Sequence, residues 1–190
     1  MRTSRRRLLA LALAAAFPAF AQEEKKKAED NSFDQDSVLK DAEAFFGKGA
    51  EGLGKVIEKA FKDHGRPNAY IKGEEAAGAI AVGLLYGNGH LVMKNAKPRR
   101  VYWQGPSIGF DLGGNLAKVF VLVYRLPRAG AIFQRFPAVD GSLYLVAGVG
   151  MNYQRSSDIT VVPIRAGVGL RAGASFGYVH YTRESSVIPF

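Results

Sequence analysis

The stretch that decides the fold is Ile164-Arg-Ala-Gly-Val-Gly-Leu-Arg-Ala-Gly-Ala-Ser-Phe-Gly-Tyr178, in which larger side chains alternate with small or charged residues. A period of two is typical of a β-strand, because successive side chains point to opposite faces of the sheet. A single flat strand from Arg165 to Tyr181 would be about 55 Å long, at roughly 3.3 Å per residue. A flat strand of that length does not fit a domain of this size. We therefore expect it to bend, as glycines allow at the corners of a barrel.

One face of this stretch is nearly bare of side chains. A bare face lets a helix, a ligand or the opposite wall of a barrel approach the backbone closely. We expect a smooth flank with free space beside it, covered by amphipathic helices, and packing of a helix on the sheet without any ligand is the alternative. The glycines that make this flank are Gly167, Gly169, Gly173 and Gly177.

Short alternating runs separated by turn residues fill the rest of residues 67–190. No helical segment connects them, which indicates neighbouring antiparallel strands. The segment Gly87-Asn88-Gly89-His90 carries the Asn-Gly pair that favours a two-residue hairpin turn, so we predict a turn there. The predicted fold class is mainly β, a small antiparallel β-barrel.

Residues 33–66 have a different period, with apolar residues at steps of three and four. This spacing predicts an amphipathic helical segment. Glycines between Gly47 and Gly54 weaken its middle, so we predict two helices with a bend near residues 47–50. The helices would pack on the barrel or inside it. Phe45, Phe46 and Phe61 are the side chains predicted to plug the barrel in the second case.

The chain begins with arginines, a short apolar run and an Ala-x-Ala ending at Ala21. These features predict a secretory signal peptide over residues 1–21, cleaved after Ala21. The general secretory route fits this leader better than the twin-arginine route, which its arginine run also resembles. Residues 22–32 are charged and poor in apolar residues, which predicts a disordered tether. The predicted location is the periplasm.

The chain has a net charge of +9 and no cysteine. Without cysteine there is no disulfide, thiolate metal site or cysteine nucleophile. A basic protein outside the cytoplasm would meet lipid headgroups or envelope polymers rather than nucleic acid. Peripheral contact with a membrane follows from this interpretation, and solubility alone is the plainer reason for the charge.

Motifs for catalysis fail in their context. Gly105-Pro106-Ser107-Ile108-Gly109 has the letters of a nucleophile elbow, but the serine lies between two predicted strands instead of between a strand and a helix. The three histidines lack the spacing of a zinc site. We therefore predict no catalytic residues, no metal site and no cofactor, and we expect a protein that is not an enzyme.

Basic and aromatic residues remain as candidates for contact with lipid or another ligand. Arginine offers a fork of donors for phosphate, and Tyr or Trp offers an amphipathic ring suited to the membrane boundary. A purely structural role, in which these residues keep strand ends soluble, is the alternative. The candidates are Arg99, Arg100, Tyr102, Trp103, Arg125 and Arg128.

Several segments resemble the exported proteins of the envelope integrity protein A family. The segments are Val101-Tyr-Trp-Gln-Gly-Pro-Ser-Ile-Gly-Phe-Asp111, Gly65-Arg-Pro-Asn-Ala-Tyr-Ile-Lys-Gly-Glu-Glu-Ala76, Tyr124-Arg-Leu-Pro127, Phe133-Gln-Arg-Phe-Pro137 and the tail from His180 to Phe190. More distantly, the Trp-Gln-Gly-Pro-Ser stretch resembles the SYLF lipid-binding domains. The resemblance covers most of residues 33–190.

The resemblance implies a small periplasmic β-barrel with an N-terminal helix, and a role in maintaining the cell envelope. It supplies no catalytic residues. Lipid or another apolar or anionic envelope component is the implied partner, and lipid binding rests on the more distant SYLF likeness. Two alternatives stay open at this point: an integral outer-membrane β-barrel and a hydrolase of envelope polymers.

Overall fold

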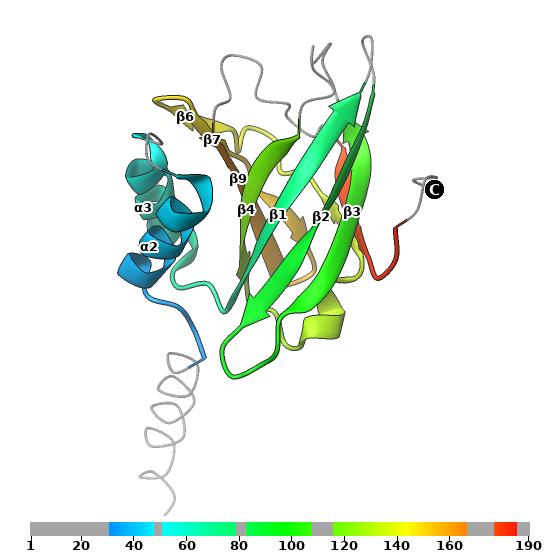
Figure 1. Ribbon diagram of the computed structural model, residues 1–190, viewed down its shortest axis with the longest axis horizontal. Coiled ribbons are helices and arrows are strands. Elements are labelled where there is room, and N and C mark those ends of the chain that lie inside the picture. The colour runs from blue at the N-terminus through cyan, green and yellow to red at the C-terminus, as the bar shows by residue number, and fades with distance from the viewer. Residues whose placement is uncertain (1–30, 48–50, 79–82, 108–115, 167–176, 186–190) are drawn as a thin grey trace, which may run out of the picture. The chain divides into compact units, whose positions relative to one another are not determined.

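The barrel and its helices lie in the unit Ser32–Phe190, seen in a computed structural model (Figure 1). The structure describes residues 31–47, 51–78, 83–107, 116–166 and 177–185. The helices are α2 (Gln35–Phe46), α3 (Leu53–His64) and the 3₁₀ helix η1 (Ala129–Ile132). The strands are β1 (Ala69–Gly78), β2 (Gly83–Met93), β3 (Arg99–Ser107), β4 (Ala117–Tyr124), β5 (Arg135–Pro137), β6 (Tyr144–Val146), β7 (Val149–Met151), β8 (Gln154–Ser156), β9 (Ile159–Ala166) and β10 (Tyr178–Thr182).

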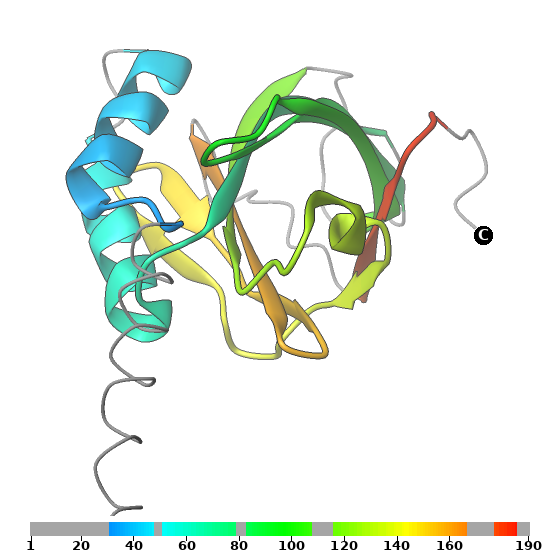
Figure 2. The ribbon, with the colours of Figure 1, turned by 90° about the horizontal axis from the view of Figure 1, so that it is seen from below.

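These strands form one antiparallel sheet in the order β5-β10-β3-β2-β1-β4-β9-β7-β6, with β8 paired to β9. The sheet returns on itself because Ala138, next to β5, bridges to Gln154 of β8. A further backbone bond runs from Val139 N to Tyr153 O at 2.8 Å. The predicted fold class is thus confirmed, and the ring of strands is visible end-on in Figure 2.

Strand β4 shows how the sheet separates two cores. Val119, Val121 and Val123 belong to the core inside the barrel. Phe120 and Leu122, the residues between them, belong to a second core shared with α2 and α3. Because both faces of β4 are buried, its sequence is almost wholly apolar, as is usual for a strand covered on both sides.

The two predicted helices are present, and both lie outside the barrel (Figure 2). Asp34 caps α2 by accepting from Ser37 N at 2.9 Å. Phe45, Phe46 and Phe61 pack in the outer core, where the Phe45 ring lies 6.3 Å from Phe120. The plug predicted for them is therefore wrong, because the outward side chains of β4 and β9 are the apolar surface that the helices cover.

The end of the barrel near the β2–β3 turn is filled by a different segment. Ile132 of η1, Leu126 and Phe136 are fully buried in the interior core. Asn68 holds the start of this segment, donating to Leu126 O at 2.8 Å and accepting from Leu126 N at 3.0 Å. The short helical turn η1 between β4 and β5 thus contributes a cap to the interior.

The predicted hairpin at Gly87-Asn88-Gly89-His90 is wrong. β2 runs unbroken through these residues, and the chain turns after Met93, where Asn95 has φ +58°. A Cβ on Gly89 would overlap the backbone of Lys72 on β1. The glycine is therefore needed for close approach of the two strands, and glycines in a strand interior often mark such a site.

His64, the last residue of α3, packs its ring 5.3 Å from Tyr124 and 4.5 Å from Tyr153. Burial lowers the pKa of His64 below its usual value; Asp63 opposes this shift, and Arg155, Arg125 and Lys59 add to it. The unfolded chain therefore binds a proton at a higher pH than the native protein does. Stability is then fully present above the unfolded pKa and falls as the pH drops through it.

We accordingly expect the free energy of unfolding to fall more steeply between pH 7.5 and 5.5 in the native protein than in His64→Phe, which keeps a ring but cannot titrate. Urea unfolding at both pH values measures the two slopes. His180, whose pKa is also lowered by burial, remains in both proteins, so the difference isolates His64. Equal slopes would contradict the expectation.

Candidate functional site: a basic end and a buried ion pair

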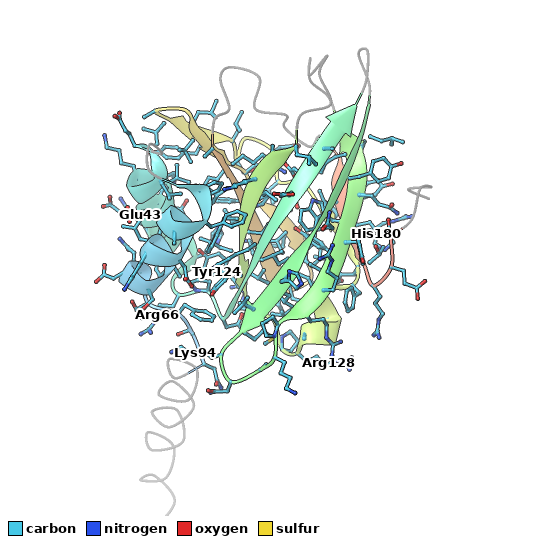
Figure 3. All side chains as sticks on the ribbon, in the orientation of Figure 1. Glu43, Arg66, Lys94, Tyr124, Arg128 and His180 are labelled. Carbon is cyan, nitrogen blue, oxygen red and sulfur yellow. The ribbon has the colours of Figure 1, made fainter. Side chains whose placement is uncertain are left out.

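The exposed basic candidates gather at one end of the barrel. Ala69, the first residue of β1, pairs with Met93 at the end of β2 and with Val123 at the end of β4. The β2–β3 turn and the segment after β4 therefore emerge at the same end, where Figure 3 labels Lys94 and Arg128. We call this group the basic end; it consists of Lys94, Lys97, Arg99, Arg100, Arg125 and Arg128, all exposed.

The side chains of the basic end make their contacts with groups other than carboxylates. In the described part of the chain, none of them forms an ion pair with a carboxylate. Arg100 instead donates to the Asn88 side-chain oxygen at 2.6 Å, and its guanidinium lies 5.4 Å over the half-buried Tyr102 ring. Arg125 donates to the backbone oxygen of Asp158 at 2.6 Å. The positive charge at this end is thus left facing solvent.

Trp103 does not belong to this surface. It is 3% exposed and points into the barrel with Val101. Its neighbours in β3, Tyr102 and Gln104, point outward. The prediction that Trp103 contacts lipid is therefore wrong: side chains alternate along β3, and the register puts Trp103 on the interior face.

Inside the barrel, Trp103 takes part in a polar cluster that sequence reasoning missed. Arg165 on β9 donates to both carboxylate oxygens of Glu75 on β1, from Nε and, at 3.2 Å, from Nη2. Trp103 Nε1 donates to Glu75 at 3.3 Å, and Arg165 Nη1 donates to the Asn152 side chain at 3.3 Å. The charged pair is thus satisfied by hydrogen bonds from both sides, as a buried ion pair requires.

The surroundings keep water away from this ion pair. The Glu75 and Arg165 side chains are 4% and 8% exposed. Burial alone would lower the pKa of Arg165, but the adjacent carboxylate raises it above its ordinary value. Burial raises the pKa of Tyr181, whose ring lies against that of Trp103. Such a cluster joins β1 to β9 and holds Trp103 in place.

Register explains how the indole reaches Glu75. Glu75 pairs with Gly87, Gly87 with Trp103, and Trp103 with Tyr181, so the four residues form one row across β1, β2, β3 and β10. A Cβ on Gly87 would overlap the indole ring, and one on Gly73 would lie 2.6 Å from Trp103 Cη2. The absence of side chains at Gly73 of β1 and Gly87 of β2 therefore leaves the space that the Trp103 ring occupies.

The predicted smooth flank lies mostly outside the described residues, as Gly167, Gly169 and Gly173 do. Gly177 is described: its φ is +112°, and a Cβ there would lie 3.2 Å from the Pro106 ring. Beside the interior glycines Gly73 of β1 and Gly87 of β2, the space is occupied by the indole of Trp103.

The sequence pattern could show that Glu75 and Arg165 both face the interior, but it could not show that they meet. Glu75 follows Ile71 and Gly73 at a period of two, which places it on the interior face of β1. Arg165 lies on the interior face of β9 in the same way. Nothing in the two strands indicates that they meet, since 90 residues separate the two partners.

The described regions contain neither a cluster of metal-binding side chains nor a helix that could span a membrane. No three His, Asp or Glu side chains of those regions lie close enough together to hold a metal ion. Likewise, none of their helices combines the length and the apolar character needed to cross a bilayer.

Comparison with known families gives the relationship directly. The model of the family described as envelope integrity protein A matches residues 31–190. This chain belongs to that family. A crystal structure of a β-barrel-like, uncharacterized protein from Brucella abortus is similar to it, with 41% identity and a TM-score of 0.77 over 84% of this chain and 99% of that one. None of the curated proteins compared with the chain matches it. Family and fold together make it an envelope-associated barrel protein.

Proposed function

We propose that the mature chain is a non-enzymatic periplasmic barrel that supports the cell envelope by contacting anionic lipid headgroups through its basic end. The observation that carries the proposal is the exposed group of lysines and arginines at one end, without carboxylate partners in the described part of the chain. Each Lys or Arg near an anionic membrane surface adds about 1 kcal/mol of attraction. The predicted signal peptide supports the periplasmic location.

The two alternatives have less support. A membrane-spanning barrel carries an apolar band on its outer face, whereas Lys72, His90 and Arg100 form one outward row across β1, β2 and β3. A polymer hydrolase usually needs two carboxylates facing one cleft. Among the described residues, Glu75 is the carboxylate buried inside the barrel, and it is bound to Arg165.

Vesicle sedimentation tests the proposal. We expect the mature protein to sediment with vesicles of equal phosphatidylglycerol and phosphatidylcholine, and to stay in solution with phosphatidylcholine alone. Lys97→Gln/Arg128→Gln should weaken binding about thirtyfold, since two cations contribute roughly 2 kcal/mol. Lys40→Gln/Lys55→Gln, with the same change of charge on exposed residues of α2 and α3, is the matched control.

Equal weakening in the two double variants would show a diffuse effect of net charge and would contradict a defined basic end. Recovery of the native protein in the supernatant with both kinds of vesicle would refute the lipid contact altogether.

A further inference from the structure

A second polar surface lies on the side of the barrel away from the helices. α2 and α3 pack against β4, β6, β7 and β9, and β3 and β10 lie on the opposite side of the ring (Figure 2). His180, labelled in Figure 3, marks this side. We call it the tyrosine–arginine face; its residues are Tyr86, Asn88, Arg100, Tyr102, Arg135, Tyr178 and His180, of which Arg100 also belongs to the basic end.

The strand register arranges these side chains in rows. Arg135, His180, Gln104 and Tyr86 lie in one row across β5, β10, β3 and β2, and Gln104 is buried among its neighbours in this row. Tyr102 pairs with Asn88, which places both in a neighbouring row. The face is therefore an array of aromatic rings and neutral hydrogen-bonding groups on the outer wall of the barrel, and an array of this kind suits a ligand rich in hydroxyl groups.

Two arginines on this face are held by rings. The Arg100 guanidinium lies 5.4 Å from the Tyr102 centroid, and that of Arg135 lies 5.2 Å from the Tyr178 centroid. In the described regions, neither arginine forms an ion pair. A guanidinium stacked on a ring loses little further freedom when it binds a carboxylate or phosphate by two parallel bonds. The face thus presents two ordered anion contacts.

We propose that the tyrosine–arginine face binds an acidic polysaccharide chain of the envelope. The stacked arginines match its negative charges, and the Asn88 amide and the His180 imidazole match its hydroxyls. Leu84 is the large exposed aliphatic residue on the described strands β1, β2, β3, β5 and β10, so the face lacks the apolar area that acyl chains would require. The proposal shares the exported location with the lipid proposal but does not depend on lipid binding.

The size of the face also favours a polysaccharide over a protein. The face covers four strands, β5, β10, β3 and β2, at roughly 4.8 Å spacing and about five residues along their length, which gives a footprint on the order of 300 Å². A stable protein interface buries about 800 Å² on each partner. A single extended polymer chain crossing the strands fits the smaller area.

Isothermal titration calorimetry of the mature protein with polygalacturonate, at physiological salt, tests this proposal. We expect binding to polygalacturonate and none to dextran, a neutral polysaccharide. Arg135→Gln should weaken the binding at least tenfold, and Tyr178→Ser should weaken it similarly because it removes the ring that orders Arg135. Arg128→Gln, the same change of charge at the basic end, should change it less than twofold. Circular dichroism checks that the variants fold.

Equal weakening by Arg135→Gln and Arg128→Gln would reduce the effect to net charge and overturn the proposal. Equal binding of dextran, or displacement of polygalacturonate by phosphatidylglycerol vesicles, would overturn it as well. Vesicle sedimentation of Arg135→Gln separates the two proposals: retained sedimentation with lost polygalacturonate binding supports two distinct surfaces, whereas loss of both argues against a separate polysaccharide face.

Discussion

Replacement of Arg165 by methionine is expected to lower the free energy of unfolding by about 3–5 kcal/mol, because it leaves the Glu75 carboxylate buried without its partner. The pair lies in the barrel interior, with the Glu75 side chain 4% exposed. Urea unfolding of the mature protein, followed by circular dichroism, measures the change. Arg99→Met removes an exposed arginine and should alter stability by no more than about 0.5 kcal/mol.

A double variant separates the charge from the packing. In Glu75→Gln/Arg165→Met the buried charges are gone, and the glutamine oxygen can still accept from Trp103 Nε1. Removal of both members of a buried pair costs far less than removal of one, so we expect the double variant to regain at least half of the loss. If the double variant were as unstable as Arg165→Met, lost packing rather than an unpaired charge would explain the effect.

Gly87→Ala is expected to destabilise the protein by about 2 kcal/mol or more, since the new methyl group would overlap the Trp103 ring and an overpacked core costs roughly 1–3 kcal/mol. Trp103 is the single tryptophan of the sequence and is buried. Its fluorescence should therefore shift to longer wavelength in the variant as the indole moves toward solvent.

Two controls test this explanation. Gly54→Ala, where a Cβ in α3 would meet nothing within 4 Å, should raise stability by up to about 1 kcal/mol, since alanine favours helix over glycine. In a Trp103→Leu background, Gly87→Ala should cost much less than in the native protein. If Gly87→Ala lowered the free energy of unfolding equally in both backgrounds, the cause would be backbone strain and not overlap with the indole ring.

The residues of β3 predicted to contact lipid or another ligand lie on both of its faces, so only some of them are exposed. The basic and aromatic chemistry of Arg99, Arg100, Tyr102 and Trp103 made them candidates for ligand contact, but it could not distinguish the two faces of β3. Tyr102 and Trp103 are both large aromatic residues, and either could have been the buried one. The contents of the facing strands decided the matter, because Gly73 and Gly87 leave room for an indole on the interior side.

The Asn-Gly pair shows a similar limit. Asn88-Gly89 has the chemistry of a tight turn, yet it lies in the middle of β2. Gly89 is needed there because the backbone of β1 approaches closely. The sequence shows that a glycine can adopt many backbone conformations and has no side chain. The neighbouring strand determines whether the glycine is used for a turn or for a close contact.

By itself, the sequence determined that the chain is mainly β with two amphipathic helices, because a period of two or of three to four is written into each segment locally. The tertiary structure alone decided that the helices cover the outside, that η1 fills one end, and that Glu75 meets Arg165. These outcomes depend on which strands become neighbours and in what register. Pairing between residues as far apart as β1 and β9 is a property of the whole sheet, which no single segment encodes.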